Sequence, residues 1–165
     1  MRAVRPRRQR HLIRVLILGG FVIAADQFTK AVVLRHLAPG THIDIVDGYV
    51  TLTLVMNPGL AFGLLGGVPS GWRWIVAVLS VAALIVLARV ALRVLPGGSR
   101  LDHAAIGLIF GGAIGNLIDR VRFGAVVDFV DLHARGYHWP AFNVADSAIS
   151  VGVVLLAVRL LLSRS

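Results

Sequence analysis

The sequence contains no cysteine, and this absence excludes several kinds of site at once. Without thiols the chain cannot form disulfides, bind a metal through thiolates, hold an iron–sulfur cluster or use a cysteine nucleophile. Charge is also sparse, because Asp, Glu, Lys and Arg together make up 15% of the 165 residues, against about a quarter in soluble domains. Few side chains are therefore available for acid–base chemistry.

Glutamate is missing as well, so every carboxyl side chain is an aspartate. The eight aspartates are Asp26, Asp44, Asp47, Asp102, Asp119, Asp128, Asp131 and Asp146. The net charge is +9, but the arginines gather at the ends of hydrophobic runs and no basic face interleaved with aromatic residues is present. We therefore expect no nucleic-acid partner, and anionic lipid headgroups are the expected counterpart of the arginine-rich N-terminus.

Hydrophobic residues make up 57% of the chain, and the mean hydropathy of +0.81 is typical of membrane proteins. Four runs are long enough to cross a bilayer core of about 30 Å. These runs cover about residues 12–37, 72–95, 101–119 and 143–162. We predict an all-α integral membrane protein with four transmembrane helices, forming a single domain over residues 1–165.

The N-terminus allows two interpretations. Residues 1–10 are predicted as a disordered, basic cytoplasmic tail before the first span. A basic segment followed by an apolar run also fits a secretory signal peptide, but the apolar pattern resumes after Asp26 and reaches the length of a membrane span.

Glycines form one face of the third predicted span. Gly107, Gly111 and Gly115 lie four residues apart, and this spacing lets another helix approach closely in lipid. The approaching helix could come from the same chain or from a second copy.

Residues 38–69 differ in character from the spans. Asp47-Gly48 is a hairpin turn signal, and the segments on either side alternate between apolar and polar residues. We predict a small extracytoplasmic β element between the first two helices, followed by a short interfacial segment over residues 60–65. Residues 120–142 are predicted as a connection of mixed polarity.

The placement of basic residues predicts the orientation. Residues 36–72 contain no Lys or Arg, whereas the N-terminal tail, the turn at residues 93–100 and the C-terminus all carry arginine. By the positive-inside rule, both termini should be cytoplasmic and the β element should lie outside.

Two groups of polar residues lie near the ends of spans. Asp26 and Lys30 are four residues apart in the order that favours a helical ion pair, although a headgroup or substrate contact is the alternative. Asn116, Asp119 and Arg120 share one face at the end of the third span. We expect this second group to be a supporting network that orients neighbouring loops, with interfacial anchoring as the alternative.

Asp128 and Asp146 lie inside strongly apolar sequence near span boundaries, where a carboxylate is costly to keep charged. Taken alone, Asp128 could be a turn residue, and Asp146 could be the third residue of a helix capped by Asn143. Together they fit a pair of carboxyl groups that share one proton and cleave an amide bond without a metal. We therefore expect the two aspartates to meet in space.

Other hydrolytic sites have no matching pattern. The chain has no HExxH motif, and Ser147 is not part of a GxSxG elbow. The histidines lie at span ends or in loops, without ligand spacing, which predicts no metal site and no haem ligation. They are His11, His36, His42, His103, His133 and His138.

Five short motifs occur in order along the chain. They are Asp26-Gln27-Phe28-Thr29-Lys30, Asn57-Pro58-Gly59-Leu60-Ala61-Phe62, Gly115-Asn116-Leu117-Ile118-Asp119-Arg120, Val126-Val127-Asp128-Phe129 and Phe142-Asn143-Val144-Ala145-Asp146-Ser147. Together they resemble lipoprotein signal peptidase (signal peptidase II) over about residues 12–160. The resemblance implies an aspartic endopeptidase of the bacterial inner membrane that needs no cofactor. Its substrates would be prolipoproteins, cut just before a diacylglyceryl-modified cysteine, and the β element would correspond to the family's β-cradle.

The resemblance also implies roles for individual residues. Asp128 and Asp146 would be the catalytic pair, near the extracytoplasmic face. Substrate-binding or supporting roles are implied for Asp26, Lys30, Asn57, Gly59, Asn116, Asp119, Arg120, Asn143 and Ala145. Membrane lipids are the other expected partners, and the expected state is a monomer.

Two rival functions are consistent with buried aspartates. A small proton-coupled transporter would use them to bind and release protons, but its acids should lie near the bilayer midplane. A scaffold or assembly factor would use them only to cap helices and neutralise arginine. Cleavage of a lipid-modified precursor peptide would separate the protease from both.

Overall fold

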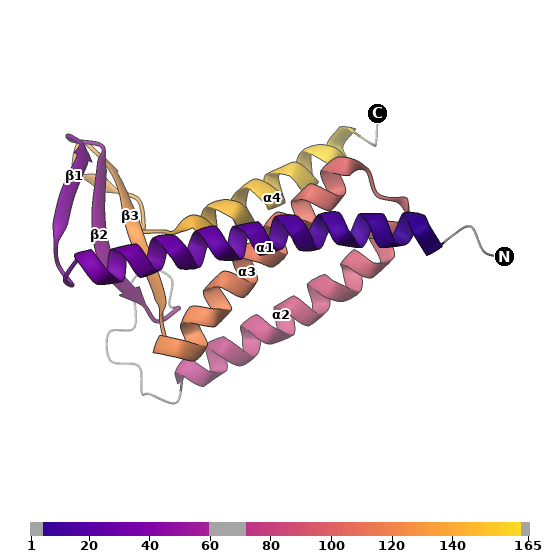
Figure 1. Cartoon of the computed structure of the whole chain (residues 1–165). Coiled ribbons are helices and arrows are strands. Elements are labelled where there is room, and N and C mark those ends of the chain that lie inside the picture. The colour runs from indigo at the N-terminus through magenta and orange to yellow at the C-terminus, as the bar shows by residue number, and fades with distance from the viewer. Residues whose placement is uncertain (1–4, 60–71, 163–165) are drawn as a thin grey trace.

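The computed structural model describes residues 5–59 and 72–162, and within these residues four long helices run along the molecule (Figure 1). The helices are α1 (Arg5–His36), α2 (Trp72–Val94), α3 (Arg100–Phe123) and α4 (Val144–Leu162), with a short 3-10 turn, η2 (Leu95–Gly97), after α2. Each is long and apolar enough to cross a membrane, which confirms the four predicted spans. The segment at residues 60–65 lies outside the described residues.

The first helix begins earlier than predicted. Its backbone is helical from Arg5, so the expectation of a disordered tail through residue 10 is wrong for residues 5–10. Pro6 does not prevent this, because a proline in the first turn of a helix lacks an N–H that would be unpaired there in any case.

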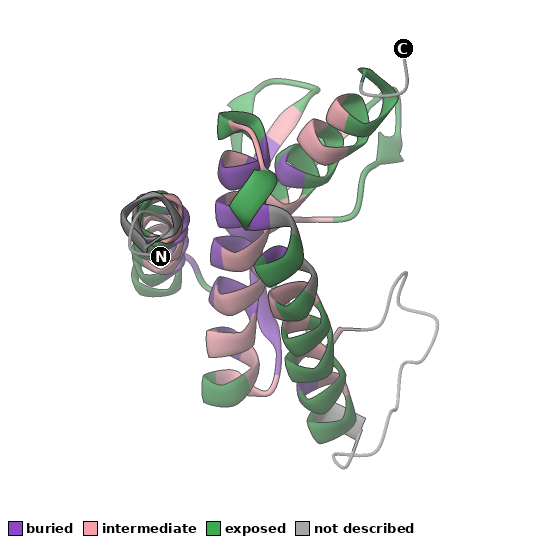
Figure 2. Ribbon diagram, turned by 90° about the vertical axis from the view of Figure 1, so that its right-hand side faces the viewer, coloured by how far each residue is buried: buried purple, intermediate pink, exposed green. Residues whose placement is uncertain are grey.

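Helix α3 lies at the centre of the bundle and packs on α1, α2 and α4. At Gly111 the α1 backbone comes so close that an added Cβ would lie 2.7 Å from the carbonyl oxygen of Gly19. The glycine face of α3 therefore packs against a helix of the same chain, which is one of the two predicted arrangements. Buried residues collect on the inward faces of the helices, while their outer faces are exposed (Figure 2).

The β structure is larger than predicted. Four antiparallel strands, in the order β1-β2-β3-β4, are β1 (His42–Val46), β2 (Val50–Asn57), β3 (Val126–Ala134) and β4 (Tyr137–His138). The predicted hairpin at Asp47-Gly48 is confirmed as the turn between β1 and β2. The predicted β element between the first two helices is present as β1 and β2, whereas β3 and β4 come from the connection between α3 and α4, where no strand was predicted.

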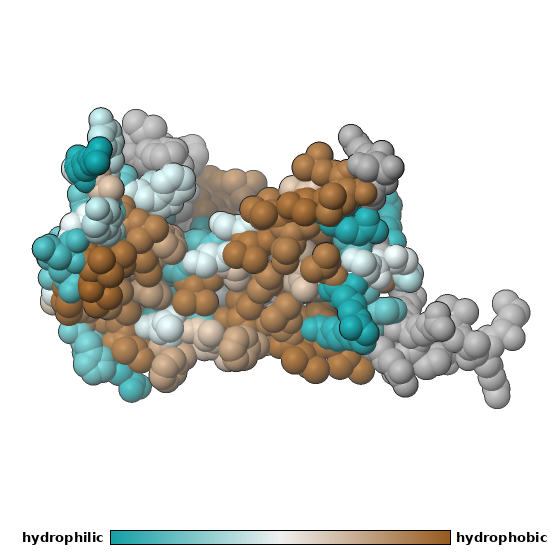
Figure 3. All heavy atoms as spheres, turned by 90° about the horizontal axis from the view of Figure 1, so that it is seen from above, coloured by the Kyte–Doolittle hydropathy of each residue, from teal (hydrophilic) through white to brown (hydrophobic). Residues whose placement is uncertain are grey.

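The sheet packs on one end of the bundle, and both described chain ends lie at the other (Figure 1). Val33 and Leu37 of α1 form a buried cluster with Leu54 of β2 and with Val127 and Phe129 of β3. This cluster fixes the start of β3 against the end of α1. Seen from above, hydrophobic atoms fill the middle of the molecule and hydrophilic atoms collect towards its two ends (Figure 3).

Candidate active site

The start of α4 is a reciprocal capping arrangement. The backbone N–H of Asp146 donates to the side-chain oxygen of Asn143 at 2.9 Å, and the backbone N–H of Asn143 donates to the Asp146 carboxylate at 3.3 Å. These bonds confirm the predicted capping pair and satisfy backbone donors that a helix start leaves free. They also fix the direction of the Asp146 carboxylate.

Asp128 lies in β3, opposite Val55 of β2, and its side chain is 2% exposed. Two amide groups donate to it, from Asn143 at 2.7 Å and from Asn57 at 2.9 Å. Its position is therefore set by a strand and by two neutral partners. The alternative that Asp128 is a turn residue is wrong.

Gly59 orients the Asn57 amide. Its backbone N–H donates to the Asn57 side-chain oxygen at 2.9 Å, which leaves the amide nitrogen of Asn57 directed at Asp128. Gly59 has φ of +90°, and a Cβ there would lie 2.7 Å from Val76. A side chain at this position would meet both backbone strain and a clash.

The two aspartates come together through shared amides. Asn143 donates from its side chain to Asp128 and from its backbone to Asp146. Asn116 donates to the other Asp146 oxygen at 2.7 Å and accepts from Asn143 at 3.2 Å. Asp128 and Asp146 are therefore both bonded to Asn143, and that they act as a pair stays a prediction.

Burial raises the pKa of the Asp128 carboxyl from its ordinary value to about 6. The hydrogen bond from Asn57 opposes this rise, and the negative charge of Asp146 adds to it. Asp128 can therefore hold a proton while Asp146, bonded to the same asparagine, acts on it electrostatically. This is the arrangement that acid–base cleavage of an amide bond requires.

A buried ion-pair cluster lies next to these carboxyl groups. Lys30, which is 2% exposed, lies 2.8 Å from Asp26 and 2.7 Å from Asp119. Its ammonium group also donates to Asn116 at 3.1 Å. The predicted ion pair between Asp26 and Lys30 is confirmed, and Asp119 extends it to a second helix.

This cluster holds the segments that carry the candidate pair. Asp26 accepts the backbone N–H of Ala145 at 2.9 Å, and Asp119 accepts that of Val127 at 3.1 Å. The predicted role of Asp119 in orienting a neighbouring segment is therefore confirmed. Gln27 was not assigned from the sequence, yet it donates to Asp119 at 3.0 Å. Its position beside Asp26 was the available signal.

Arg120 lies on the last turns of α3, half-buried, with Asp146, Asp128 and Asp119 within electrostatic range. Among the described residues its Nε has no hydrogen-bond partner, and one terminal nitrogen donates weakly to the Asn116 carbonyl at 3.4 Å. A guanidinium with a free donor beside the carboxyl groups can bind carbonyl oxygens of a substrate.

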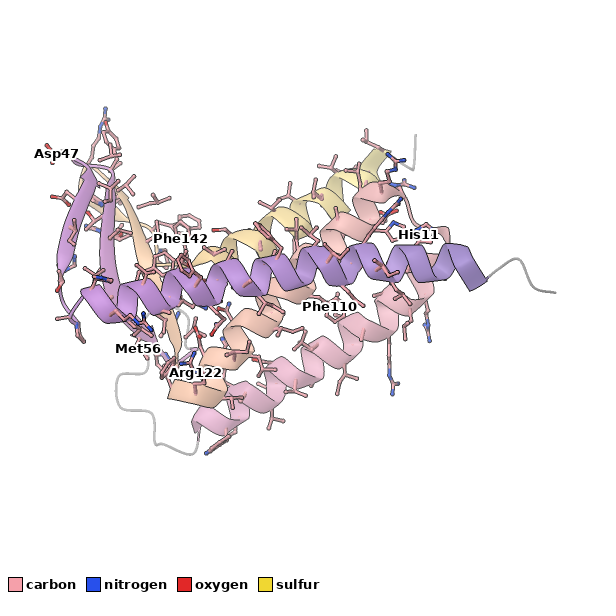
Figure 4. The ribbon with its side chains drawn as sticks, viewed as in Figure 1. His11, Asp47, Met56, Phe110, Arg122 and Phe142 are labelled. Carbon is pink, nitrogen blue, oxygen red and sulfur yellow. The ribbon has the colours of Figure 1, made fainter. Side chains whose placement is uncertain are left out.

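A cavity of about 340 Å³ lies elsewhere, between α1, α2 and α3. Its lining is apolar and includes Val15, Leu92 and Phe110, of which Phe110 is labelled in Figure 4. It contains no carboxyl group, so it is separate from the candidate active site.

Asp131 lies in β3, within the predicted connection at residues 120–142, and pairs with His138 of β4. The hairpin of β3 and β4 was not predicted, because no Asn-Gly or Asp-Gly turn signals it.

Comparison with known proteins identifies similar chains along nearly the whole sequence. Residues 18–162 match the family model described as Signal peptidase (SPase) II. A lipoprotein signal peptidase of Syntrophus aciditrophicus (strain SB) is 41% identical over 153 residues, covering 91% of this chain and 93% of that protein. A lipoprotein signal peptidase of Geobacter sulfurreducens is 45% identical over 150 residues, covering 91% of each. A bacterial membrane enzyme solved by the in meso method matches with a TM-score of 0.73 and 33% identity, covering 92% of this chain and 89% of that one.

Proposed function

Because the chain belongs to the signal peptidase II family, we propose that Asp128 and Asp146 are the catalytic pair of an aspartic endopeptidase. Family membership makes the protein a peptidase that removes the signal peptide from prolipoproteins. It is a multi-pass protein of the bacterial inner membrane. The transporter interpretation has no support from these similarities, and Asp128 lies on a strand outside the spanning helices.

The observation that carries the proposal is the amide of Asn143, which donates to Asp128 at 2.7 Å while its backbone donates to Asp146. One residue thereby ties a strand carboxyl to a helix carboxyl. Within residues 5–59 and 72–162, neither carboxyl group forms a salt bridge. A proton is then the natural means of relieving the repulsion between the two carboxyl groups.

The reaction uses the two carboxyl groups in opposite protonation states. Asp146, at the N-terminus of α4, accepts a proton from water, and the hydroxide adds to the scissile carbonyl carbon. Asp128 donates its proton to the carbonyl oxygen. Asp146 then passes its proton to the amide nitrogen, the C–N bond breaks, and Asp128 takes back the proton from the oxygen, which leaves a carboxylic acid and an amine. An apolar substrate segment excludes water from Asp128 and further favours its protonated form.

Substrate positioning falls to the polar residues around the pair. Asn57 lies at the end of β2 and Arg120 on α3, so they flank the carboxyl groups from two sides. We assign them to the substrate backbone near the lipid-modified cysteine, with the cut directly before that cysteine. Asn116 and Asn143 orient the carboxyl groups, while Asp26, Lys30, Asp119 and Ala145 hold the supporting framework.

The orientation follows from the ends of the molecule. The described chain ends lie together, away from the sheet (Figure 1), and the arginine-rich segments belong to that end. We therefore place both termini in the cytoplasm and the catalytic pair near the extracytoplasmic face. A monomer in contact with membrane lipids is proposed, because Gly107 and Gly111 are already covered by α1 and Gly112 by α4.

The test is cleavage of a diacylglyceryl-modified precursor peptide by the purified protein, followed by mass spectrometry. Asp128→Asn and Asp146→Asn should each lower the rate by on the order of 10² to 10⁴-fold, because each removes one acid–base group. Asp47→Asn, in the exposed turn between β1 and β2 (Figure 4), is the matched control. Turnover near the parent rate by either dyad variant would remove that residue from the pair.

A further inference from the structure

A second group of titratable side chains lies on the sheet, apart from the proposed catalytic pair. Asp131 and His133 of β3 and His138 of β4 each direct one potential ligand atom into a common space. These three atoms lie within 4.8 Å of one another. None of the three residues has a role in the cleavage mechanism.

The hairpin between β3 and β4 brings these residues together. Arg135 and Gly136 form its two-residue turn, with φ of +50° and +83°. Positive φ at both positions is the mark of a type I′ turn, whose twist matches that of the strands. His133 therefore faces His138 directly across the two strands, and the two rings stack with centroids 4.9 Å apart.

Asp131 completes the group from the same face. It precedes His133 by two residues, and side chains two apart on a strand point to the same side. Its carboxylate oxygens lie 3.0 and 3.2 Å from Nδ1 of His138. The Asp131 side chain is 14% exposed and that of His138 is 59% exposed, so the group opens to solvent on one side only.

We propose that Asp131, His133 and His138 bind one divalent transition-metal ion, for which Zn²⁺ is the best fit. Tetrahedral Zn²⁺ takes nitrogen and oxygen ligands at about 2.0–2.2 Å, which places neighbouring donors about 3.3 Å apart. The Asp131 to His138 separation of 3.0 Å already meets this distance. Rotation of the His133 ring closes the third position, and water supplies the fourth.

One further feature of His133 supports a ligand at this point. Its Nδ1 is shielded from solvent and has no hydrogen-bond partner among the described residues. Binding of a metal through one ring nitrogen leaves the other as a donor, and two imidazoles with one carboxylate are a donor set suited to Zn²⁺ and Cu²⁺. The metal takes the place of the Nδ1 proton that His138 donates to Asp131, and this proton is released to solvent.

The position of the site indicates what the metal would do. The segment after β4 leads through Phe142, whose backbone bonds to Val130 of β3 at 2.9 and 3.0 Å, to Asn143 at the catalytic pair. Figure 4 labels Phe142 where the sheet meets α4. A metal that joins β3 to β4 restrains the segment that leads from β4 to Asn143, without contacting the catalytic pair. It acts as a structural clamp on the sheet and takes no part in the cleavage step.

The test uses the full-length protein in detergent, purified through an affinity tag without histidine and treated with a chelator. Isothermal titration with Zn²⁺ alone should give one site per chain. His138→Ala and Asp131→Asn should each weaken binding by at least tenfold, since each removes a ligand. His42→Ala, which removes an exposed histidine of β1, should bind as the parent does.

Two readouts keep the proposal independent of cleavage. Zn²⁺ should raise the unfolding temperature of the parent and of His42→Ala but not of His138→Ala, because a ligand of the folded state stabilises it. Electron paramagnetic resonance of added Cu²⁺ should show coupling to two nitrogens in the parent and to one in His138→Ala. Absence of stoichiometric binding, or equal binding by the parent and both ligand variants, would overturn the proposal. Neither result would bear on Asp128 and Asp146, which are intact in every variant.

Discussion

Four aspartates are packed into one end of this molecule, yet they occupy two different environments. Asp26 and Asp119 both contact the ammonium group of Lys30, the only lysine of the chain, at 2.7–2.8 Å. Asp128 and Asp146 receive hydrogen bonds from neutral amides, chiefly those of Asn143 and the nearby asparagines. The first pair is in direct contact with a permanent cation, whereas the second pair forms no salt bridge within the described residues and, in the proposed mechanism, shares a proton.

The two environments suit two different roles, a structural role for Asp26 and Asp119 and the proposed acid–base role for Asp128 and Asp146. A carboxylate in a salt bridge with a buried ammonium group is held in one position, so it serves as a fixed acceptor. Asp26 and Asp119 use this charge to hold backbone N–H groups at the starts of α4 and β3. A carboxyl group with amide partners can gain or lose a proton without losing its place, which suits acid–base catalysis.

The largest effect should come from removing the cation. Lys30→Met leaves two buried carboxylates without a partner, and breaking a buried ion pair in this way costs about 3–5 kcal/mol. The unfolding temperature in detergent should fall steeply, and cleavage should be lost with the fold. The measurement is thermal unfolding followed by intrinsic fluorescence.

Asp128→Asn should have the opposite effect on the unfolding temperature. The raised pKa means that the folded state favours protonated Asp128, so its contribution to stability is lost as pH rises from the ordinary aspartate range through about 6. Asparagine cannot ionise, so this variant should be at least as stable as the parent at mildly alkaline pH, although inactive. A Lys30→Met protein that unfolds like Asp128→Asn would erase the distinction between the two environments.

Asn143 joins the two carboxyl groups and should rank next. Asn143→Ala removes the amide bond to Asp128 and the cap of α4. A lost cap costs about 1 kcal/mol, and the misplaced carboxyl groups should lower kcat by on the order of 10²-fold. Asn143→Asp, which retains the cap, should recover the capping contribution but not activity, because it adds a third carboxyl group beside the pair. Recovery of the rate by that variant would argue against a shared proton.

The pH dependence of kcat/KM should be a smaller but more specific effect. In the free enzyme, loss of the proton from Asp128 near its pKa of about 6 leaves both carboxyl groups charged, so kcat/KM should fall above this pH. The hydrogen bond from Asn57 lowers the Asp128 pKa. Asn57→Ala should therefore move the falling limb to higher pH, independently of any loss in rate, whereas Asp47→Asn should not move it.

The smallest effect should come from Gln27. Gln27→Ala removes the donor to Asp119 at 3.0 Å and to the Gly115 carbonyl at 3.2 Å. Each such hydrogen bond contributes about 0.5–1.5 kcal/mol, so a modest drop in unfolding temperature is expected. Because the ion pairs of Lys30 remain, the shape of the pH–rate profile should match that of the parent. A changed profile would show that the ion-pair cluster of Lys30 affects the titration of the catalytic pair more than the contacts indicate.

Local features of the fold could be predicted from the sequence, whereas long-range pairing could not. The spans, the hairpin at Asp47-Gly48 and the ion pair of Asp26 with Lys30 depend on neighbours within a few positions. β3 was missed because its partner β2 lies far back in the chain, with Asn57 opposite Val126. Its first residues are also buried on both faces, so the alternation that marks a half-exposed strand is absent.

The candidate site shows the same limit. Motif order identified Asp128 and Asp146, and the capping pair of Asn143 and Asp146 was readable from three-residue spacing. That Lys30 serves Asp119 as well as Asp26 was not readable, because the contact joins α1 to α3. The cluster of Asp131 with two histidines was also hidden, since its ligands meet only across a turn formed by Arg135 and Gly136.

The contact between Asp26 and the backbone of Ala145 has a consequence for biosynthesis. It joins α1 to α4, the first and last of the four long helices described, and Asp146 is the residue after Ala145 in the first turn of α4. A nascent chain that has inserted only three spans has one of the two proposed catalytic carboxyl groups and no partner for it. In the proposed mechanism, cleavage therefore requires that α4 has docked against α1, and a chain without this packing has no complete catalytic pair.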